Sequence, residues 1–289
     1  MTLKGIPKLP IEIDDKIALK IYRKIAVING KIGRLNSELN HSIINDNFIN
    51  IMSIRESLES TKIEGTQVTF DEVLEEKMDK NPSNEVKEVL NYMDALSYGF
   101  EQITTHNRPL STKLIKELHT ILLTGTRGKD KNPGNFRKIQ NFIGPDNKIE
   151  NATYIPIEAN LIEEYMTNLE YFMNGMEHQS LKEEPFKTYF NYNADPLIRT
   201  AISHAQFESI HPFLDGNGRL GRILIILMLV NAKTIEKPVF FVSEELEKEK
   251  ARYYDLLNGV RSEKSDWQGW ITFFLQATER MIDSILLKI

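Results

Sequence analysis

Residues 210–222 read IHPFLDGNGRLGR, and an apolar run of eight residues follows directly. Pro212 ends any helix that precedes it, and Gly216 and Gly218 leave backbone N–H groups unobstructed. Asn217 or Gly218 is a plausible cap for a helix that begins here. The stretch therefore predicts a polar turn that opens into a buried helix.

The polar side chains of this turn suit chemistry on a nucleoside polyphosphate. A glycine-rich turn at a helix N-terminus binds anions, because free N–H groups and the helix dipole both favour negative charge. Arg219 and Arg222 are three residues apart and project from one face of the first turn. Asp215 offers a hard oxygen ligand suited to Mg²⁺, and His211 offers a base that titrates near neutral pH.

Other nucleotide-binding motifs fit this stretch less well. Residues 216–221 match G-x-G-x-x-G, but the dinucleotide fingerprint requires a preceding strand within a βαβ unit. Here a predicted helix that begins at Asp195 and Pro196 leads into the turn. A phosphate loop of the Walker type requires Gly-Lys followed by Ser or Thr, which residues 210–222 lack.

The stretch also carries the signature of a known family. The pattern His-Pro-Phe-x-Asp-Gly-Asn-Gly-Arg-x-x-Arg, complete from His211 to Arg222, resembles the signature of Fic-domain proteins. The resemblance implies an all-α, mainly helical Fic fold with one β-hairpin flap over the active site. It also implies a protein adenylyltransferase, an enzyme that transfers AMP from ATP to a Ser, Thr or Tyr hydroxyl of a protein.

The resemblance gives each polar residue of the signature a role. His211 is the base that takes a proton from the attacking hydroxyl, and Asp215 holds the Mg²⁺ that bridges the α- and β-phosphates. Arg219 faces the β-phosphate and Arg222 the γ-phosphate. The residues implied in ATP binding are Gly216, Asn217, Gly218, Arg219, Arg222 and Tyr254. ATP is thus the expected co-substrate and Mg²⁺ the expected cofactor.

A second informative stretch lies far upstream, where residues 60–65 read STKIEG. Gly65 is placed like a glycine at a helix C-terminus, with Ser60 and Glu64 one turn apart. A carboxylate at that end is slightly unfavourable for the helix dipole, which hints at another partner. The motif resembles the inhibitory helix of Fic proteins, whose glutamate pairs with the second signature arginine, here Arg222, in place of the ATP γ-phosphate. A capped surface helix with a solvated glutamate is the alternative.

Residues 124–157 change character, because glycines and prolines break any long helix. Residues 136–143 alternate weakly, a turn follows around residues 144–147, and residues 153–155 can form the returning strand. This hairpin resembles the Fic flap, which aligns the backbone of a target protein beside the active site. The implied target-positioning residues are Lys138, Ile139, Gln140 and Tyr154. A surface hairpin that closes the helical core is the alternative.

Helical periodicity accounts for most of the remaining chain, after an extended arm over residues 1–14. Ser111 and Asp195 are placed as N-cap residues. His119 is assigned no role, and His204 is expected to be packed or hydrogen-bonded. The segments expected to be helical are 15–35, 49–61, 70–78, 85–100, 112–122, 157–173, 196–209, 243–260 and 267–287.

These patterns divide the chain into three regions. Residues 1–108 are expected to form an N-terminal helical region with the inhibitory helix, and residues 109–240 the Fic core with its flap and signature. Residues 241–289 are expected to form C-terminal helices that pack on the core. Tyr253 and Tyr254 in this last region resemble the family segment that lines the adenine pocket, although aromatic residues on a helix are more often core.

The composition is that of an ordinary globular protein of 289 residues, with 41% hydrophobic and 27% charged residues. The net charge of −5 and the scattered basic residues argue against a nucleic-acid partner. The absence of cysteine excludes disulfides and cysteine nucleophiles. The N-terminus lacks the apolar core of a signal peptide, and the longest apolar run is too short to span a bilayer. A cytoplasmic protein without a membrane partner is therefore expected.

Several activities remain open. The same glutamate permits removal of AMP, so a bifunctional or de-AMPylating enzyme is one alternative, and a Fic enzyme with another nucleotide donor is a second. A non-catalytic helical protein that binds a partner is the alternative from a different class, although it predicts a degraded signature. The expected partner is a protein substrate. Modification of the chain by itself and a homodimer are further alternatives.

Overall fold

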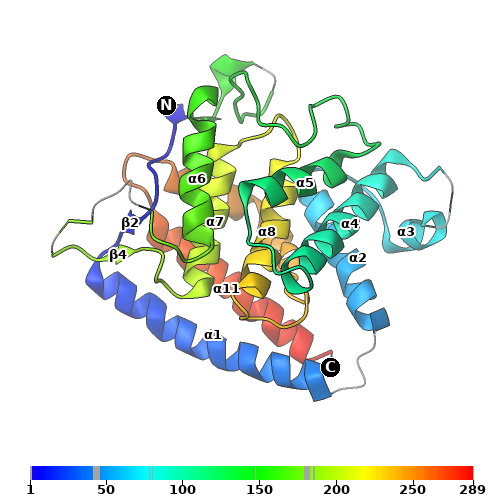
Figure 1. The fold of residues 1–289 in the computed structure, drawn as a ribbon, viewed down its shortest axis with the longest axis horizontal. Coiled ribbons are helices and arrows are strands. Elements are labelled where there is room, and N and C mark those ends of the chain that lie inside the picture. The colour runs from blue at the N-terminus through cyan, green and yellow to red at the C-terminus, as the bar shows by residue number, and fades with distance from the viewer. Residues whose placement is uncertain are drawn as a thin grey trace.

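The computed structural model describes residues 2–41, 46–77, 79, 81–146, 148–178, 183, 184 and 186–288. Within these residues the chain forms eleven α-helices and four strands of two residues each (Figure 1). The mainly helical architecture expected from the sequence is confirmed.

Helix α8 (Asn217–Asn231), which follows the signature turn, lies in the middle of the molecule (Figure 1). Almost all of its residues are buried, as expected for the apolar run in the sequence. Helix α7 (Pro196–Ile210) packs against it and is buried along nearly its whole length. The Leu197 N–H donates to the Asp195 carboxylate at 2.8 Å, so α7 starts with the predicted cap.

Further helices surround this central pair. α4 (Asn84–Thr104) and α5 (Thr112–Leu123) pack on α8, and α6 (Ile162–Met173) packs on α7. α1 (Asp15–His41) runs along the edge of the molecule beside α11 (Trp267–Leu286) (Figure 1). The apolar faces of these helices, predicted from their periodicity, meet in one hydrophobic core.

The expected inhibitory segment forms α2 (Asp46–Ile63), which is longer than the sequence predicted. It packs against α4 and against α9 (Ser243–Lys248). The short helix α3 (Phe70–Glu76) follows, and its predicted end at Met78 lies outside the described residues. Helix α2 is therefore part of the packed body of the protein.

The single helix predicted over residues 243–260 is wrong, because the chain breaks it at Glu249. There φ is −115° and ψ is 34°, which separates α9 from α10 (Lys250–Val260). No proline or glycine marks the break in the sequence. The Ser243 N–H at the start of α9 donates to Glu56 of α2, whereas α10 packs on α7 and α11. Tertiary contacts therefore set the two helix axes.

The predicted β-hairpin is present only in part. β3 (Tyr154–Ile155) pairs with Ile143 through one antiparallel bridge, and residues 136–142 do not form a strand. The backbone of this segment bonds to the signature turn instead, at the Pro212 carbonyl. The other edge of β3 pairs in parallel with β1 (Leu3–Lys4). The predicted hairpin turn ends at Asn147, outside the described residues.

The N-terminal arm is extended, as predicted. Each of its two short strands pairs with a strand from a distant part of the chain. β1 pairs with β3, and β2 (Ile11–Glu12) pairs antiparallel with β4 (Tyr189–Phe190). All three sequence regions contribute to the hydrophobic core. In the part of the chain that the structure describes, none of the helices has both the length and the apolarity needed to cross a membrane.

Candidate active site

The signature turn begins where α7 ends, at His211. This residue has a left-handed backbone conformation, with φ 49° and ψ 60°, which is uncommon outside glycine. The His211 N–H donates to the Phe207 carbonyl at 2.9 Å, and the Arg137 Nε donates to the His211 carbonyl at 3.0 Å. These bonds fix the direction in which the imidazole leaves the backbone.

The His211 imidazole is in the neutral form that a general base requires. Its Nδ1 donates to the Glu208 carbonyl at 3.3 Å, which leaves the lone pair on Nε2. Burial, together with the cationic Arg261 and Arg137, lowers the pKa of His211 to about 4. Nε2 can therefore accept a proton from a hydroxyl at neutral pH.

Phe213 and Asn217 hold the turn against the core. The Phe213 N–H donates to the Asn217 Oδ1 at 3.0 Å, and the Asn217 Nδ2 donates back to the Phe213 carbonyl at 2.9 Å. Both side chains are buried. The ATP contact predicted for Asn217 would therefore use its backbone N–H, because its side chain closes the turn.

His119 of α5 supports the turn, although the sequence assigned it no role. Its ring stacks on Phe213 with centroids 3.8 Å apart. Its Nδ1 accepts from the Gly134 N–H at 2.8 Å, so Nε2 donates to the Asp215 carbonyl at 2.9 Å. Burial lowers the pKa of His119 to about 4, which preserves this pattern at neutral pH. One feature of the sequence could have indicated this role. His119 occupies a core position of an amphipathic helix, four residues after Ile115.

The first turn of α8 carries backbone N–H groups that can bind an anion. Gly216 is the N-cap with φ 75°, so it replaces the caps expected at Asn217 or Gly218. Its N–H donates to the Asp215 carboxylate at 2.6 Å. Among the described residues, nothing accepts a hydrogen bond from the N–H groups of Asn217, Gly218 and Arg219. Three such donors at a helix N-terminus can bind an anion.

Asp215 is placed to share a cation with a bound phosphate. Its side chain is 42% exposed, and the Gly216 N–H holds one of its oxygens. The described part of the chain contains no cluster of three or more His, Asp or Glu side chains that could hold a metal ion. A single carboxylate suits Mg²⁺ when phosphate oxygens supply further ligands.

Arg222 is held by the inhibitory segment, and its side chain is 1% exposed. Its Nε donates to Ser60 Oγ at 2.8 Å. Its Nη2 donates to the Ser60 carbonyl at 2.9 Å and to Glu64 Oε1 at 2.7 Å. The structure thus brings together three residues that the sequence singled out, although 158 residues separate Glu64 from Arg222.

Both partners of this pair are charged at neutral pH. Burial alone would lower the pKa of Arg222, but the Glu64 carboxylate raises it above its usual value. Burial alone would raise the pKa of Glu64, but the charge of Arg222 and its hydrogen bond lower it. The contact is therefore a hydrogen-bonded ion pair.

Glu64 lies directly over the first turn of α8. A Cβ added to Gly218 would be 2.2 Å from Glu64 Oε1 and 3.1 Å from Arg222 Nη1. Glycine at this position lets the carboxylate approach the helix N-terminus. The Glu64 side chain is 36% exposed, so its other side faces solvent.

The end of α2 sets the position of Glu64. Gly65 has φ 95°, and its N–H donates to the Lys62 carbonyl at 3.0 Å. The Thr66 N–H donates to the Thr61 carbonyl at 3.2 Å. These two bonds form a Schellman motif with glycine at its left-handed position, so Gly65 is the C-terminal glycine of the helix as predicted.

Arg219 is buried without filling its hydrogen-bonding capacity. Its side chain is 7% exposed, with Nη1 3.6 Å from Glu88 Oε2 and Nη2 3.8 Å from Asp215 Oδ1. In the described part of the chain, no group accepts a hydrogen bond from its Nε or Nη1. The sequence assigned no role to Glu88. The feature that could have indicated one is a carboxylate at a core position of α4, four residues before Tyr92.

The two tyrosines of α10 have different surroundings. Tyr253 is buried and its hydroxyl bonds to His204 Nε2 at 2.8 Å, so His204 is hydrogen-bonded as expected. Tyr254 is 39% exposed. Burial and the charge of Glu64 raise the pKa of Tyr254.

The predicted flap residues divide into exposed and buried ones. Lys138, Ile139 and Gln140 are exposed beside the signature turn and available to a target. Tyr154 is fully buried, and its hydroxyl donates to the Ser209 carbonyl at 2.7 Å. The Tyr154 side chain therefore anchors the flap to α7 and is not itself exposed to a target.

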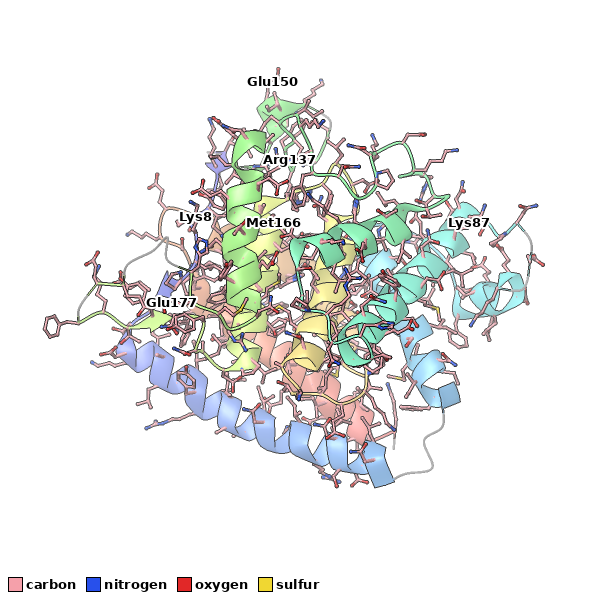
Figure 2. All side chains as sticks on the ribbon, in the orientation of Figure 1. Lys8, Lys87, Arg137, Glu150, Met166 and Glu177 are labelled. Carbon is pink, nitrogen blue, oxygen red and sulfur yellow. The ribbon has the colours of Figure 1, made fainter. Side chains whose placement is uncertain are left out.

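Arg137 joins the flap to the signature turn. Its guanidinium is buried and donates to the carbonyls of His211, Ile139 and Ile157. Burial lowers the pKa of Arg137 to about 10, so the group is still charged at neutral pH. Arg137 and Glu150 lie at the same end of the molecule (Figure 2). The sequence pattern of weak alternation over residues 136–143 does not reveal these carbonyl partners.

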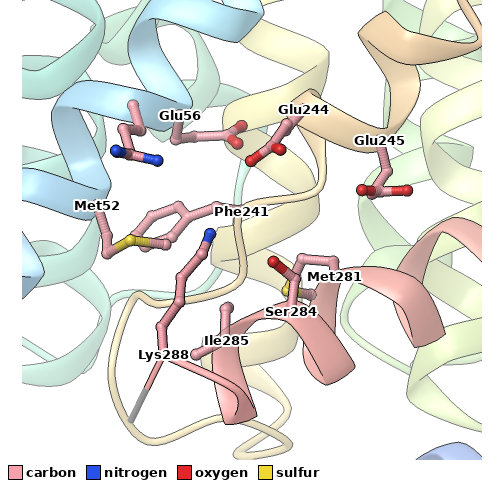
Figure 3. A pocket seen from close by; sticks show the side chains of 10 residues that line it. Met52, Glu56, Phe241, Glu244, Glu245, Met281, Ser284, Ile285 and Lys288 are labelled. Atoms are coloured by element: carbon pink, nitrogen blue, oxygen red, sulfur yellow. The ribbon is translucent and has the colours of Figure 1, made fainter. Parts of the chain in front are cut away.

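Glu56 fastens the middle of α2 to the C-terminal helices and was also missed from the sequence. It accepts hydrogen bonds from the Tyr92 hydroxyl at 3.0 Å, from the Ser243 N–H at 3.1 Å and from the Ser243 hydroxyl. Burial raises the pKa of Glu56 to about 7. It lies beside a hollow of about 20 Å³ between α2, α9 and α11, lined also by Met52 and Phe241 (Figure 3).

Comparison with known proteins assigns the family. A family model described as Fic/DOC family matches residues 109–229, and one described as Fic/DOC family N-terminal matches residues 22–101. Together the two matches span most of the chain. The chain belongs to the Fic/DOC family.

Curated Fic relatives and a solved Fic structure resemble the chain at modest identity. It is 26% identical over 232 residues to protein adenylyltransferase Fic of Culex quinquefasciatus and 27% identical over 232 residues to the protein of that name of Nematostella vectensis. These alignments cover 78% of this chain but 40% and 47% of the relatives, so the chain spans less than half of their length. The fold is similar to a Fic family protein from Desulfovibrio desulfuricans G20, with TM-score 0.74, 22% identity and coverage of 98% of this chain and 77% of that chain.

The two Fic matches meet at the site. The N-terminal match includes Ser60 and Glu64, and the other match includes the whole signature. The ion pair of Glu64 with Arg222 therefore joins the two matched regions of the Fic chain.

Proposed function

We propose that this Fic protein transfers AMP from ATP to a Ser, Thr or Tyr hydroxyl of a protein, and that Glu64 inhibits the transfer. The observation that carries the proposal is the Glu64 carboxylate, which lies 2.7 Å from Arg222 over the first turn of α8. A carboxylate bound there takes the place that a terminal phosphate needs. The names of the curated relatives support the same activity.

His211 is the general base in this proposal. The hydroxyl oxygen of the target attacks the α-phosphorus, the bond from that phosphorus to the pyrophosphate breaks, and the hydroxyl proton passes to His211 Nε2. A pKa of about 4 keeps the imidazole neutral and ready to accept this proton at pH 7. Such a base typically contributes about 10²–10⁴-fold to the rate.

The phosphates are bound by backbone donors and two arginines. The free N–H groups of the first turn of α8 face the α- and β-phosphates. Arg219, whose donors are unbonded, serves the β-phosphate, and Arg222 serves the γ-phosphate once Glu64 leaves. Tyr254 lines the pocket for the adenine ring of ATP. Catalysis then rests on positioning and electrostatic stabilisation.

Mg²⁺ fits the residues present at Asp215. The carboxylate is partly exposed and is oriented by the Gly216 N–H, which leaves an oxygen for a metal. Asp215 would hold Mg²⁺ together with phosphate oxygens, and the ion would neutralise charge on the leaving pyrophosphate. A protein target is aligned by the exposed flap residues Lys138, Ile139 and Gln140.

The test is transfer of label from α-labelled ATP in the presence of Mg²⁺. Wild type, Glu64→Gly and Glu64→Gly/His211→Ala are compared on the protein itself and on lysate proteins. We expect strong labelling with Glu64→Gly, weak labelling with wild type and none with the double variant. Absence of label with Glu64→Gly contradicts the proposal, and release of AMP from a modified protein by wild type then supports AMP removal instead.

A further inference from the structure

The end of the inhibitory helix contacts both signature arginines, by different routes. Glu64 bonds directly to Arg222. Thr66 is buried, and its hydroxyl donates to Glu88 Oε2 at 2.7 Å. The same oxygen of Glu88 lies 3.6 Å from Arg219 Nη1. The residues on either side of the left-handed glycine are thus connected to one arginine each.

Glu88 is placed as the counterion of Arg219. The side chains of both residues are 7% exposed. A buried guanidinium is costly unless a carboxylate compensates its charge. Asp215 is farther from Arg219, at 3.8 Å, and largely faces solvent. Arg127 donates to the other oxygen of Glu88 from an exposed position, so the carboxylate lies between two cationic side chains.

Arg219 is kept in place by charge more than by hydrogen bonds. As far as the structure describes the chain, its Nε and Nη1 have no acceptor. A guanidinium in this state can donate to an anion without breaking an existing bond. Its orientation then depends on the nearest buried charge, which is Glu88.

We infer that Glu88 is a positioning residue that holds Arg219 for the β-phosphate of the nucleotide. Through Thr66, it also ties the end of the inhibitory helix to that arginine. The inference rests on the proposed function, because it takes the ligand to be a nucleoside di- or triphosphate. Glu88 itself does not touch the nucleotide and acts through Arg219.

The inference predicts an effect that depends on the number of phosphates. AMP has no β-phosphate, so its affinity does not depend on the position of Arg219. ADP has a β-phosphate, so its affinity depends on the position of Arg219. A general disturbance of the fold would weaken the binding of both nucleotides.

The test compares binding of AMP and ADP, with Mg²⁺, to Glu64→Gly and to Glu64→Gly/Glu88→Gln by isothermal titration calorimetry. Glutamine keeps the shape of Glu88 and an acceptor for Thr66 but removes the charge. We expect the Kd for ADP to rise about tenfold, the size of one charge-assisted hydrogen bond, while the Kd for AMP stays within about twofold.

Glu85→Gln in the same background is the matched control. Glu85 lies on α4 one turn earlier and pairs with Arg127 at 3.6 Å, with a side chain that is 40% exposed. Its removal should leave ADP binding unchanged. Equal losses for AMP and ADP in the Glu88 variant, or no loss for either, overturn the inference. If Glu64→Gly binds neither nucleotide, the proposed function fails first, and the inference with it.

Thr66→Val tests the connection to the inhibitory helix without removing a charge, and it remains available if Glu88→Gln does not fold. Valine has nearly the shape of threonine but cannot donate to Glu88. In the otherwise wild-type chain, label transfer from α-labelled ATP should rise by about fivefold, because the end of α2 loses one buried hydrogen bond. Transfer at the wild-type level overturns the connection.

Discussion

The signature turn and the inhibitory helix meet at Arg222, but different kinds of contact hold them. In the turn, buried neutral groups bond to each other, as Asn217 does to both backbone groups of Phe213. At the end of α2, the contacts go to a charged group, because Ser60 and Glu64 both accept from the Arg222 guanidinium.

This difference shows which part of the site can move. A phosphate cannot replace the backbone partners of the turn, whereas Arg222 can exchange a carboxylate for a phosphate. An anion at the N-terminus of α8 therefore competes with Glu64 and leaves the turn unchanged. The bonds that hold the turn are present without a nucleotide, and in the proposed function a nucleotide phosphate displaces Glu64 from Arg222.

The largest effect is expected at the turn, from His211→Ala in the Glu64→Gly background. Loss of the base should reduce the rate of label transfer by about 10²–10⁴-fold. ATP affinity should change little, because His211 serves the attacking hydroxyl. A loss of less than about tenfold in single-turnover transfer would show that another group is the base.

At the inhibitory helix, Glu64→Gly alone should raise transfer by about 5–150-fold, the usual range for coupling between competing states. The control is Glu59→Gly, which places glycine in the same helix but removes a carboxylate that pairs with Lys62. The control should stay near the wild-type rate. Equal rises in both variants would mean that a weakened helix, and not the lost carboxylate, releases the enzyme.

The pH dependence separates the turn from an ordinary exposed histidine. With a pKa of about 4, His211 stays mostly neutral at pH 5 and keeps its function as a base. A histidine of pKa 6.5 would instead lose about 30-fold of its neutral form there. Removal of Glu64 lowers this pKa further, because its negative charge favours the imidazolium.

The measurement is kcat/KM of Glu64→Gly between pH 5 and pH 8, with circular dichroism as a control for folding. We expect no acid limb centred near pH 6.5. An apparent pKa at that value would contradict the burial of the base.

A smaller effect is expected on the stability of the turn. Asn217→Ala leaves two buried backbone groups of Phe213 without partners and should reduce the free energy of unfolding by about 1–3 kcal/mol. Urea unfolding measures the change. The exposed Asn135→Ala, on a surface loop, should stay within about 0.5 kcal/mol of wild type. Equal stability of the two variants would show that Asn217 does not hold the turn.

The smallest effect is expected for the surface contacts of α2. Lys62 pairs with Glu247 at 3.2 Å, and its side chain is 45% exposed. Lys62→Ala should change the stability by less than about 1 kcal/mol and leave transfer near the wild-type level. Activation as strong as that of Glu64→Gly would mean that exposed ion pairs keep the helix in place.

Local sequence rules were sufficient for the helices and for the residues next to the signature. Gly65 follows the end of α2, Asp195 caps α7, and the apolar run after Arg222 is buried, because each depends on neighbours within a few residues. The resemblance supplied the pairing of Glu64 with Arg222, which no local rule contains.

The missed residues share one physical property. Glu56, Glu88 and His119 are polar side chains at buried positions of helices, and their partners are contributed by distant segments. Periodicity shows that such a residue points inward but not what it meets there. The same limit explains Arg137 and Tyr154, whose backbone acceptors are on the end of α7.

The most direct test of the central claim compares the affinities of ATP and ADP for wild type and for Glu64→Gly by isothermal titration calorimetry. If Glu64 takes the place of the γ-phosphate at Arg222, wild type binds the two nucleotides equally. Glu64→Gly then binds ATP about tenfold or more tightly than ADP, because Arg222 gains a charge-assisted bond to the γ-phosphate. The same ratio of ATP to ADP affinity in both proteins would contradict the claim.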